Sequence, residues 1–186
     1  HHCLFARGAL LAGETVLVQA AAGGVGLAAV QLAKHAGARV IAVSSGSERL
    51  VKLQSVGADH VVDHRNDNVA EAVLDLTDGA GANLVIDPVG TTLPVSLKAL
   101  AQEGRLVFVG NAGGGDLALD LWPALQANQS LFGVFMGTKF VVPRVSATVD
   151  NLLSLVAASK LTVFLDKRFP LASAAEAHDH AERRRP

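Results

Sequence analysis

Three short stretches of the chain share one layout, and this layout restricts the possible folds more than any other feature. Gly37, Gly57 and Gly81 are each followed by an alanine, one or two polar residues and then a run of branched apolar residues, at spacings of 20 and 24 residues. Glycine tolerates the left-handed conformation that ends many helices. A helix that ends in glycine and leads at once into a strand is typical of βα units, which build a parallel sheet with helices on both faces.

The sequence therefore predicts a doubly wound parallel sheet of the Rossmann type, with about six strands in three α/β/α layers. We expect a single domain over residues 1–186. Runs of branched residues predict strands at residues 15–19, 39–43, 61–63, 84–86, 106–109 and 131–135. Helical spacing of apolar residues predicts helices at residues 24–36, 47–56, 68–77, 92–100, 150–158 and 172–181.

Composition excludes several classes of protein. Half of the residues are apolar and 18% are charged, which excludes intrinsic disorder. The net charge of −1 argues against a broad nucleic-acid-binding surface. Cys3 is the single cysteine, so there is no intrachain disulfide and no cysteine-rich zinc site. Residues 16–33 are apolar enough to suggest a membrane span, but glycines interrupt them, so we expect a buried strand, turn and helix in a cytoplasmic protein without membrane partners.

The strongest chemical signal is the glycine-rich segment between the first predicted strand and the first predicted helix. Gly23 and Gly26 occupy the second and third positions of the dinucleotide pattern G-x-G-x-x-G, with Ala21 at the first. Gly24 and Val25 lie between them, where free N–H groups at a helix N-terminus would face a pyrophosphate. The alternatives are a tight turn that binds nothing, and a methyltransferase site, which would need an acidic residue where Gln19 stands.

The end of the second predicted strand favours NADP(H). An NAD site usually presents an acidic residue there to the ribose 2′-hydroxyl. This strand ends instead in Ser44 and Ser45, and Arg49 follows in the next helix, which suits a 2′-phosphate. The alternative is a local role: Ser45 and Glu48 would form a capping box, and Arg49 would be a solvated helix residue.

Residues 15–18 (TVLV) followed by 21–34 (AAGGVGLAAVQLAK) resemble the cofactor domain of the medium-chain dehydrogenase/reductases. Residues 57–65, 87–90 and 104–110 fit the same family. Within it the chain is similar to the zinc-independent quinone oxidoreductases of the zeta-crystallin-like group. The resemblance extends over residues 11–181.

The resemblance implies an NADPH-dependent reductase that passes hydride to a quinone or an activated alkene. It places His64 beside the adenosine end of the cofactor, although an exposed loop histidine is the alternative. It also implies a set of residues near the ribose and nicotinamide, at the ends of later strands, where open α/β sheets bind ligands: Val89, Gly90, Gly110, Asn111 and Phe135. The family's N-terminal catalytic domain is not among these residues, so we expect the isolated chain to be inactive and leave its catalytic residues unassigned.

Three further expectations follow from the residues and the resemblance. Residues 131–135 form an apolar candidate edge strand, through which relatives pair as homodimers. No metal site is expected: His1 and His2 suggest a tag remnant or a frayed end, and His178 and His180 form the other histidine cluster. Two alternative functions stay open, the enoyl-reductase domain of a polyketide synthase and a non-catalytic dinucleotide-binding structural protein.

Overall fold

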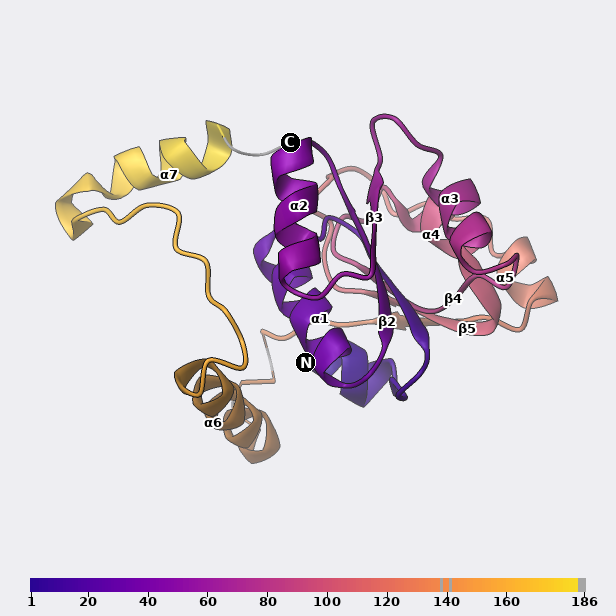
Figure 1. The fold of residues 1–186 in the computed structure, drawn as a ribbon, viewed down its shortest axis with the longest axis horizontal. Helices are drawn as coiled ribbons and strands as arrows, with labels where there is room; N and C mark the ends of the chain where they lie inside the picture. The colour runs from indigo at the N-terminus through magenta and orange to yellow at the C-terminus, as the bar shows by residue number, and fades with distance from the viewer. Residues whose placement is uncertain (138, 141, 184–186) are drawn as a thin grey trace.

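The computed structural model describes residues 1–137, 139–140 and 142–183. Its centre is a six-stranded sheet in the order β3-β2-β1-β4-β5-β6, in which every neighbouring pair is parallel (Figure 1). The strands are β1 (Thr15–Val18), β2 (Arg39–Ser44), β3 (His60–Asp63), β4 (Ala82–Asp87), β5 (Leu100–Phe108) and β6 (Ser130–Gly133).

Helices cover both faces of the sheet, with α1 and α2 on one face and α3, α4 and α5 on the other (Figure 1). Their bounds are α1 (Gly24–His35), α2 (Ser47–Ser55), α3 (Val69–Leu76), α4 (Leu93–Lys98) and α5 (Trp122–Gln126). A π-helix, η1 (His2–Arg7), precedes β1. The strand order and the two covered faces confirm the predicted doubly wound fold of three layers.

The core follows from the alternation of side chains along each strand. Val16 and Val18 of β1 are fully buried in a cluster that includes residues of α1, α2 and η1. Leu17 points to the opposite face and packs in a second cluster with residues of α3, α4 and α5. Because β1 is covered on both sides, its run of four apolar or β-branched residues needs no polar face.

The order of the strands reverses between β1 and β4, because the chain builds outward from β1 to β3 and then returns to add β4 on the other side. In open sheets of this kind the loops after β1 and β4 diverge and leave a crevice at the carboxyl ends of the strands. The glycine-rich segment after β1 lies at this crevice.

The structure corrects three sequence predictions. β5 begins at Leu100, earlier than predicted, because a register shift between Ala82 and Leu84 allows the polar stretch around Glu103, with φ of 58°, to remain in the strand. A helix, α6 (Pro143–Ala157), begins seven residues before the predicted 150–158, with Pro143 in its first turn, where proline is well tolerated. The short helices η1 and α5 were not predicted.

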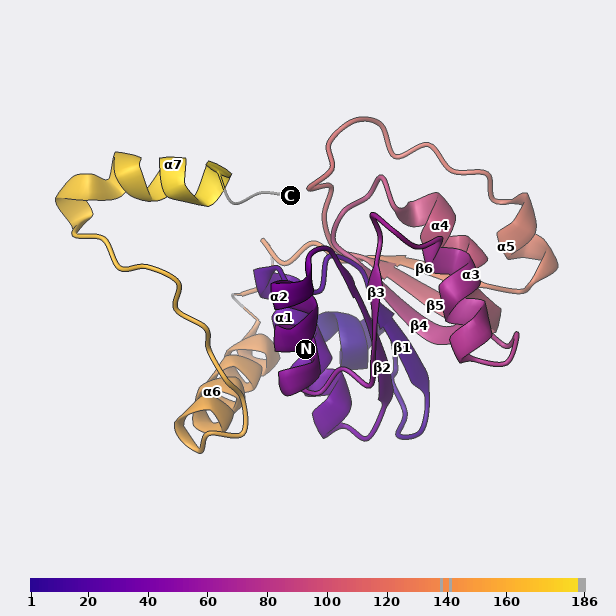
Figure 2. The ribbon, with the colours of Figure 1, turned by 45° about the horizontal axis from the view of Figure 1, so that its top comes forward.

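Residues 143–183 form an arm that extends away from the sheet (Figures 1 and 2). It contains α6, a short 3₁₀ turn, η2 (Leu171–Ser173), and α7 (Ala174–Arg183). Neither helix has a fully buried side chain, although Leu152 of α6 packs partly buried against the core. Gln31 of α1 attaches the arm: its Oε1 accepts from Thr162 N–H at 2.7 Å, and its Nε2 donates to Thr162 O at 3.1 Å.

Within the described part of the chain, no helix combines the length and the apolar character that crossing a membrane would require.

Candidate dinucleotide-binding site

The glycine-rich segment forms a tight turn that delivers the chain from β1 into α1. Ala20 takes a positive φ of 46°, and Ala21 N–H then donates to Val43 O of β2 at 2.8 Å. Gly23 is the N-cap residue of α1, and no side chain caps this helix. Leu27 N–H makes the first α-helical bond back to Gly23 O, at 2.8 Å.

The first turn of α1 therefore presents backbone donors to the crevice. Gly24, Val25 and Gly26 precede the first helical hydrogen bond, and their N–H groups have no acceptor among the described residues. Gly24 and Val25 are exposed, and a Cβ added at Gly24 would meet no atom within 4 Å. Free N–H groups and the positive end of the helix dipole suit a diphosphate, so the donor set fits a dinucleotide.

Gly26 has the packing role expected of the third glycine. It is buried, and a Cβ at this position would lie 2.5 Å from Ala21 Cα and 2.6 Å from Ala20 O. No backbone shift can absorb such contacts without moving α1 away from β1. The absence of a side chain at Gly26 therefore sets the distance between the helix N-terminus and the sheet.

The ends of β2 and β3 bring together the residues predicted for the 2′-phosphate. His64 N–H donates to Ser44 O at 3.0 Å, and Arg49 lies partly exposed in the first turn of α2. Ser44 and Ser45 are buried, with 5% and 3% of their surfaces exposed, so less of each hydroxyl is accessible than the sequence suggested. The capping-box alternative is wrong, because Gly46, with φ of 84°, is the N-cap of α2 and no side chain caps it.

Asp63, at the end of β3, was not among the predicted site residues, because the acidic residue of an NAD site is expected at the end of β2. Asp63 pairs in register with Ser44. Its Oδ1 accepts from Arg65 N–H at 3.0 Å and its Oδ2 from Gly46 N–H at 3.3 Å. The hydrogen bond from Arg65 N–H is the main cause that lowers the pKa of Asp63. The carboxylate thus holds the turn that leads into α2.

The loops after β4 and β5 pack against each other. Gly90 has φ of 85°, and a Cβ there would lie 2.4 Å from Asn111 Oδ1. A Cβ on Gly110 would lie 2.8 Å from Pro88 O, and Gly113 N–H donates to Val89 O at 2.9 Å. The structure therefore brings Val89, Gly90, Gly110 and Asn111 together, with the Asn111 amide donating to Gly115 O at 2.8 Å.

A buried carboxylate fixes the loop after β4. Asp87 is fully buried and accepts four hydrogen bonds: from Val89 N–H (2.9 Å) and Gly90 N–H (3.1 Å) on Oδ1, and from Thr92 Oγ1 and Ser96 Oγ (both 2.7 Å) on Oδ2. Ser96 Oγ also accepts from Gln19 Nε2 at 3.2 Å. This network connects the segments after β1 and β4 across the point where the strand order reverses.

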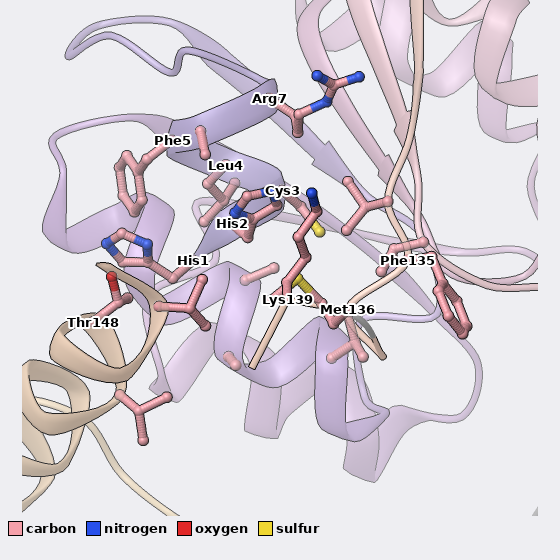
Figure 3. Close-up of a pocket in the computed structure, with 18 of the residues that line it drawn as sticks. His1, His2, Cys3, Leu4, Phe5, Arg7, Phe135, Met136, Lys139 and Thr148 are labelled. Carbon is pink, nitrogen blue, oxygen red and sulfur yellow. The ribbon is translucent and has the colours of Figure 1, made fainter. Parts of the chain in front are cut away.

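A cavity of about 920 Å³ opens beside the N-terminus of α1 (Figure 3). Gly24 and Val25 contribute to it, with Ile86 and Val109 from the ends of β4 and β5. Phe135, which is 77% exposed, lies at its rim. The volume lies within the range of small-molecule sites. Gly90, Gly110 and Asn111 lie at the same edge of the sheet but outside this lining.

The segment predicted as a tag remnant or a frayed end also lines the cavity. His1, His2 and Cys3 all contribute to the wall, and His2 begins η1, whose Leu4 is buried in the core. Burial raises the pKa of the Cys3 thiol. Partial burial is also the main cause that lowers the pKa of His2, and the positive charges of Arg7, Lys139 and Arg144 lower it further. Nothing in the sequence pattern linked these residues to the glycine loop.

Among the residues that the structure describes, no three His, Cys, Asp or Glu side chains are grouped so that they could hold a metal ion. His178 and His180 do not converge on a third such residue. His180 Nε2 lies 2.6 Å from Asp166 Oδ2, between α7 and the segment before it.

The zinc-binding dehydrogenase family matches residues 24–158. The chain belongs to this family. It corresponds to the nucleotide-binding part of a medium-chain dehydrogenase/reductase, which confirms the resemblance seen in the sequence. In this family the Rossmann sheet and the glycine turn described above form the cofactor domain.

Curated relatives of the chain include a quinone oxidoreductase of Pseudomonas aeruginosa, 36% identical over 182 residues. A subunit of the phenolphthiocerol/phthiocerol polyketide synthase of Mycobacterium tuberculosis is 33% identical over 179 residues. Each match covers 95% of the chain. Among solved structures, mycobacterial Rv1454c complexed with NADPH is 35% identical, with a TM-score of 0.89 over 99% of the chain.

The chain spans only part of these relatives. It covers 55% of the Pseudomonas quinone oxidoreductase, 58% of the mycobacterial Rv1454c chain and 8% of the polyketide synthase. The chain thus spans about half the length of the quinone oxidoreductase and of Rv1454c.

Proposed function

We propose that this chain is the NADP(H)-binding half of an oxidoreductase that transfers hydride from NADPH to a quinone or an activated alkene. The observation that carries the proposal is the exposed, uncapped N-terminus of α1, which lies at the reversal of strand order and opens into the cavity. The similarity to Rv1454c complexed with NADPH supports the choice of cofactor.

Each part of the site has a task in this proposal. The N–H groups of Gly24 and Val25 would hold the pyrophosphate, and Gly23 lets it approach the backbone. Arg49, His64 and the serines at positions 44 and 45 would surround the adenosine 2′-phosphate. The nicotinamide would enter the cavity, near Val109 and Phe135, while Val89, Gly90, Gly110 and Asn111 would border the ribose.

When bound, the cofactor supplies the hydride, and the protein supplies binding and orientation. The cavity wall from Ile86, Val109 and Val134 is apolar, which keeps water away from the reacting face. Hydride transfer needs the acceptor roughly 3–3.5 Å from the nicotinamide. A second domain would complete that cleft, so we propose that the 186-residue chain alone shows negligible turnover.

Gly24→Asp tests the proposal without weakening the fold. A carboxylate in the first turn of α1 interacts favourably with the positive end of the helix dipole, and a Cβ at this site meets no neighbouring atom. The same carboxylate would repel a bound pyrophosphate. We expect NADPH affinity, measured by calorimetry, to fall more than about tenfold, the equivalent of roughly 1.4 kcal/mol.

Gly24→Asn is the matched control, because it adds nearly the same volume without the charge. It should retain most of the affinity. The proposal fails if wild type does not bind NADPH, or if Gly24→Asp binds it as tightly as Gly24→Asn does.

The enoyl-reductase domain of a polyketide synthase is the second candidate, and the 33% identity to the mycobacterial synthase supports it. The parent gene separates the two candidates: flanking carrier-protein sequence indicates a synthase, and a stand-alone reading frame of roughly twice this length indicates a reductase.

We also propose that the parent protein is a zinc-independent cytoplasmic homodimer. β6 lies at the edge of the sheet, as predicted, and one side of this strand has no neighbour in the sheet among the described residues. Two copies could join there and extend the sheet. Analytical ultracentrifugation that detects only monomer at micromolar concentration would contradict the dimer, and metal analysis of the parent tests its independence of zinc.

A further inference from the structure

Three polar side chains occupy core positions on the face of the sheet that α4 covers, where the strand order reverses. Gln19 follows β1, Asp87 ends β4 and Ser96 belongs to α4, and their exposed fractions are 2%, 0% and 0%. The alternation of side chains along the strands puts Gln19 on the same face as Leu17, and Asp87 on the same face as Val85. Apolar side chains fill the rest of this face, so polar groups here need a reason other than packing.

Stability alone does not explain this buried cluster. Apolar groups of the same shape can replace a buried hydrogen-bonded pair with little or no loss of stability. A buried network does, however, hold its members in one arrangement, because any departure leaves a polar group unpaired in a place that water does not reach. The cluster is therefore suited to fixing the geometry of the segments that it joins.

Gln19 belongs to the segment that leads into the glycine-rich turn. Its backbone N–H donates to Ile86 O at 3.0 Å, and its Nε2 donates to Ser96 Oγ at 3.2 Å. The next residue, Ala20, has φ of 46° and begins the turn that delivers the chain to Gly24. The side chain of Gln19 thus anchors the base of the turn to α4, on the face of the sheet opposite to α1.

Ser96 connects this anchor to the loop after β4. Its hydroxyl donates to Asp87 Oδ2 at 2.7 Å. Asp87 Oδ1 accepts from Val89 N–H at 2.9 Å and from Gly90 N–H at 3.1 Å. Val89 O in turn accepts from Gly113 N–H at 2.9 Å, in the loop after β5. A continuous series of contacts therefore runs from the base of the glycine-rich turn to the loops that we propose to border the ribose.

We propose that Gln19 is a positioning residue for the cofactor. Through Ser96 and Asp87 it keeps the pyrophosphate donors of α1 at a fixed distance from the loop after β4. A dinucleotide must contact both places at once, so a fixed separation avoids the cost of ordering them on binding. This inference rests on the proposed function, and it assigns a role to a side chain that is not among the described residues lining the cavity.

Gln19→Met tests the link, because it keeps an unbranched side chain of similar length and removes the donor to Ser96. Two ligands are titrated by calorimetry into the 186-residue chain: NADPH, and 2′,5′-ADP, which has the adenosine end without the nicotinamide ribose. We expect NADPH affinity to fall about fivefold, the size for one neutral hydrogen bond. The affinity for 2′,5′-ADP should not change, because Ala21 N–H still holds the turn to Val43 O.

Thr77→Val is the matched control. It removes a buried side-chain hydrogen bond at the amino end of β4, where Thr77 Oγ1 accepts from Gly81 N–H at 2.9 Å. Both variants should lose free energy of unfolding in urea, but Thr77→Val should keep the wild-type ratio of the two affinities. A role in folding stability alone would leave that ratio the same in Gln19→Met as well.

Ser96→Ala removes the middle of the link and provides a second measurement if Gln19→Met does not fold. It should lower NADPH affinity at least as much as Gln19→Met does, with the affinity for 2′,5′-ADP unchanged. Because Gln19 acts through Ser96 in this proposal, the double variant should bind NADPH no more weakly than Ser96→Ala alone.

Three results would overturn the inference: an unchanged ratio of affinities in Gln19→Met (or in Ser96→Ala, if that variant alone folds), the same change of ratio in Thr77→Val, or full additivity of the two losses in the double variant. Failure of the proposed function looks different, because wild type would then not bind NADPH.

Discussion

The amino and carboxyl ends of the parallel strands form two opposite edges of the sheet. These two edges differ in whether their polar groups have partners within the chain. At the amino edge, Asn83 Oδ1 accepts from Thr15 N–H at 2.8 Å, and Glu14 pairs with Arg105 at 2.7 Å. Asp59 pairs with Lys34 at 2.6 Å and accepts from Val40 N–H at 2.8 Å. At the carboxyl edge, the N–H groups that begin α1 face a cavity and have no acceptor among the described residues.

The difference separates stability from binding. Polar groups that are satisfied within the chain hold the ends of strands together, and those left without a partner are available to a ligand. Substitutions at the amino edge should therefore change the free energy of unfolding, and those at the carboxyl edge should change affinity. Asp87 is an exception, because it lies at the carboxyl edge but is fully buried and hydrogen-bonded.

Asp87→Ala should give the largest effect, and this effect should be on stability although Asp87 lies at the carboxyl edge. It therefore breaks the simple division between stability and affinity. It leaves four donors without their acceptor, in a site with no solvent access. We expect the free energy of unfolding, measured in urea, to fall by about 3–5 kcal/mol, because each buried donor that loses its acceptor costs about 1–3 kcal/mol. Asp87→Asn keeps the size and one carbonyl oxygen, so its loss should be smaller. A loss below about 1 kcal/mol in Asp87→Ala would mean that water replaces the carboxylate.

Arg49→Ala should give the next largest effect, and we expect that effect on NADPH affinity. A charge-assisted contact to an exposed 2′-phosphate corresponds to about tenfold in NADPH affinity at the lower end of its range. NADH affinity should stay the same, as should both affinities in the control Arg168→Ala, an exposed position on the arm. Equal weakening of both cofactors in calorimetry would assign Arg49 to the stability of α2 instead.

The sequence could predict this fold because its elements follow from local patterns. The β-branched runs and the glycines at 37, 57 and 81 are short-range signals, and they locate β2, β3 and β4 to within two residues. The donors at Gly24 and Val25 were equally predictable, because a strand, a glycine turn and a helix are consecutive in the chain.

What could not be predicted depends on contacts between distant residues. The start of β5 at Leu100 depends on its pairing with Ala82, across a polar stretch that looks like a loop. Arg7 and Arg144 both line the cavity but lie far apart in the sequence, so no spacing connects them. The position of Asp63 beside Ser44 could not be predicted, because it depends on the register between β2 and β3.

Glu14→Gln tests the amino ends of the strands, with an expected effect smaller than that of Asp87→Ala. The pair with Arg105 is partly buried, with side chains 17% and 21% exposed. We expect a loss of about 1–2 kcal/mol in unfolding free energy, between the values of exposed and buried pairs. NADPH affinity should not change. A change in affinity without a change in stability would contradict the separation of the two edges.

The smallest effect concerns the titration of His2. Its pKa in the folded chain should lie below the ordinary 6.5, because partial burial and then the neighbouring cations disfavour its charged form. Protonation therefore opposes folding: this contribution to stability is present above pH 6.5 and is lost as the pH falls through the lowered pKa. Lys139→Gln should raise the pKa of His2 in an NMR titration, and an unchanged value would place Lys139 too far away to act.

The hydrogen bonds between Gln31 and Thr162 affect the order in which parts of the molecule unfold. α6 and α7 have no fully buried side chain, and Leu152 and Leu161 are only partly buried against the core, so opening of the arm should expose less apolar surface than opening of the sheet. The two hydrogen bonds between Gln31 and Thr162 join α1 to the arm beyond α6, and both are exposed to solvent. The arm therefore behaves as a separate unit of local unfolding, and its backbone amides should exchange with solvent long before those of β1 and β4.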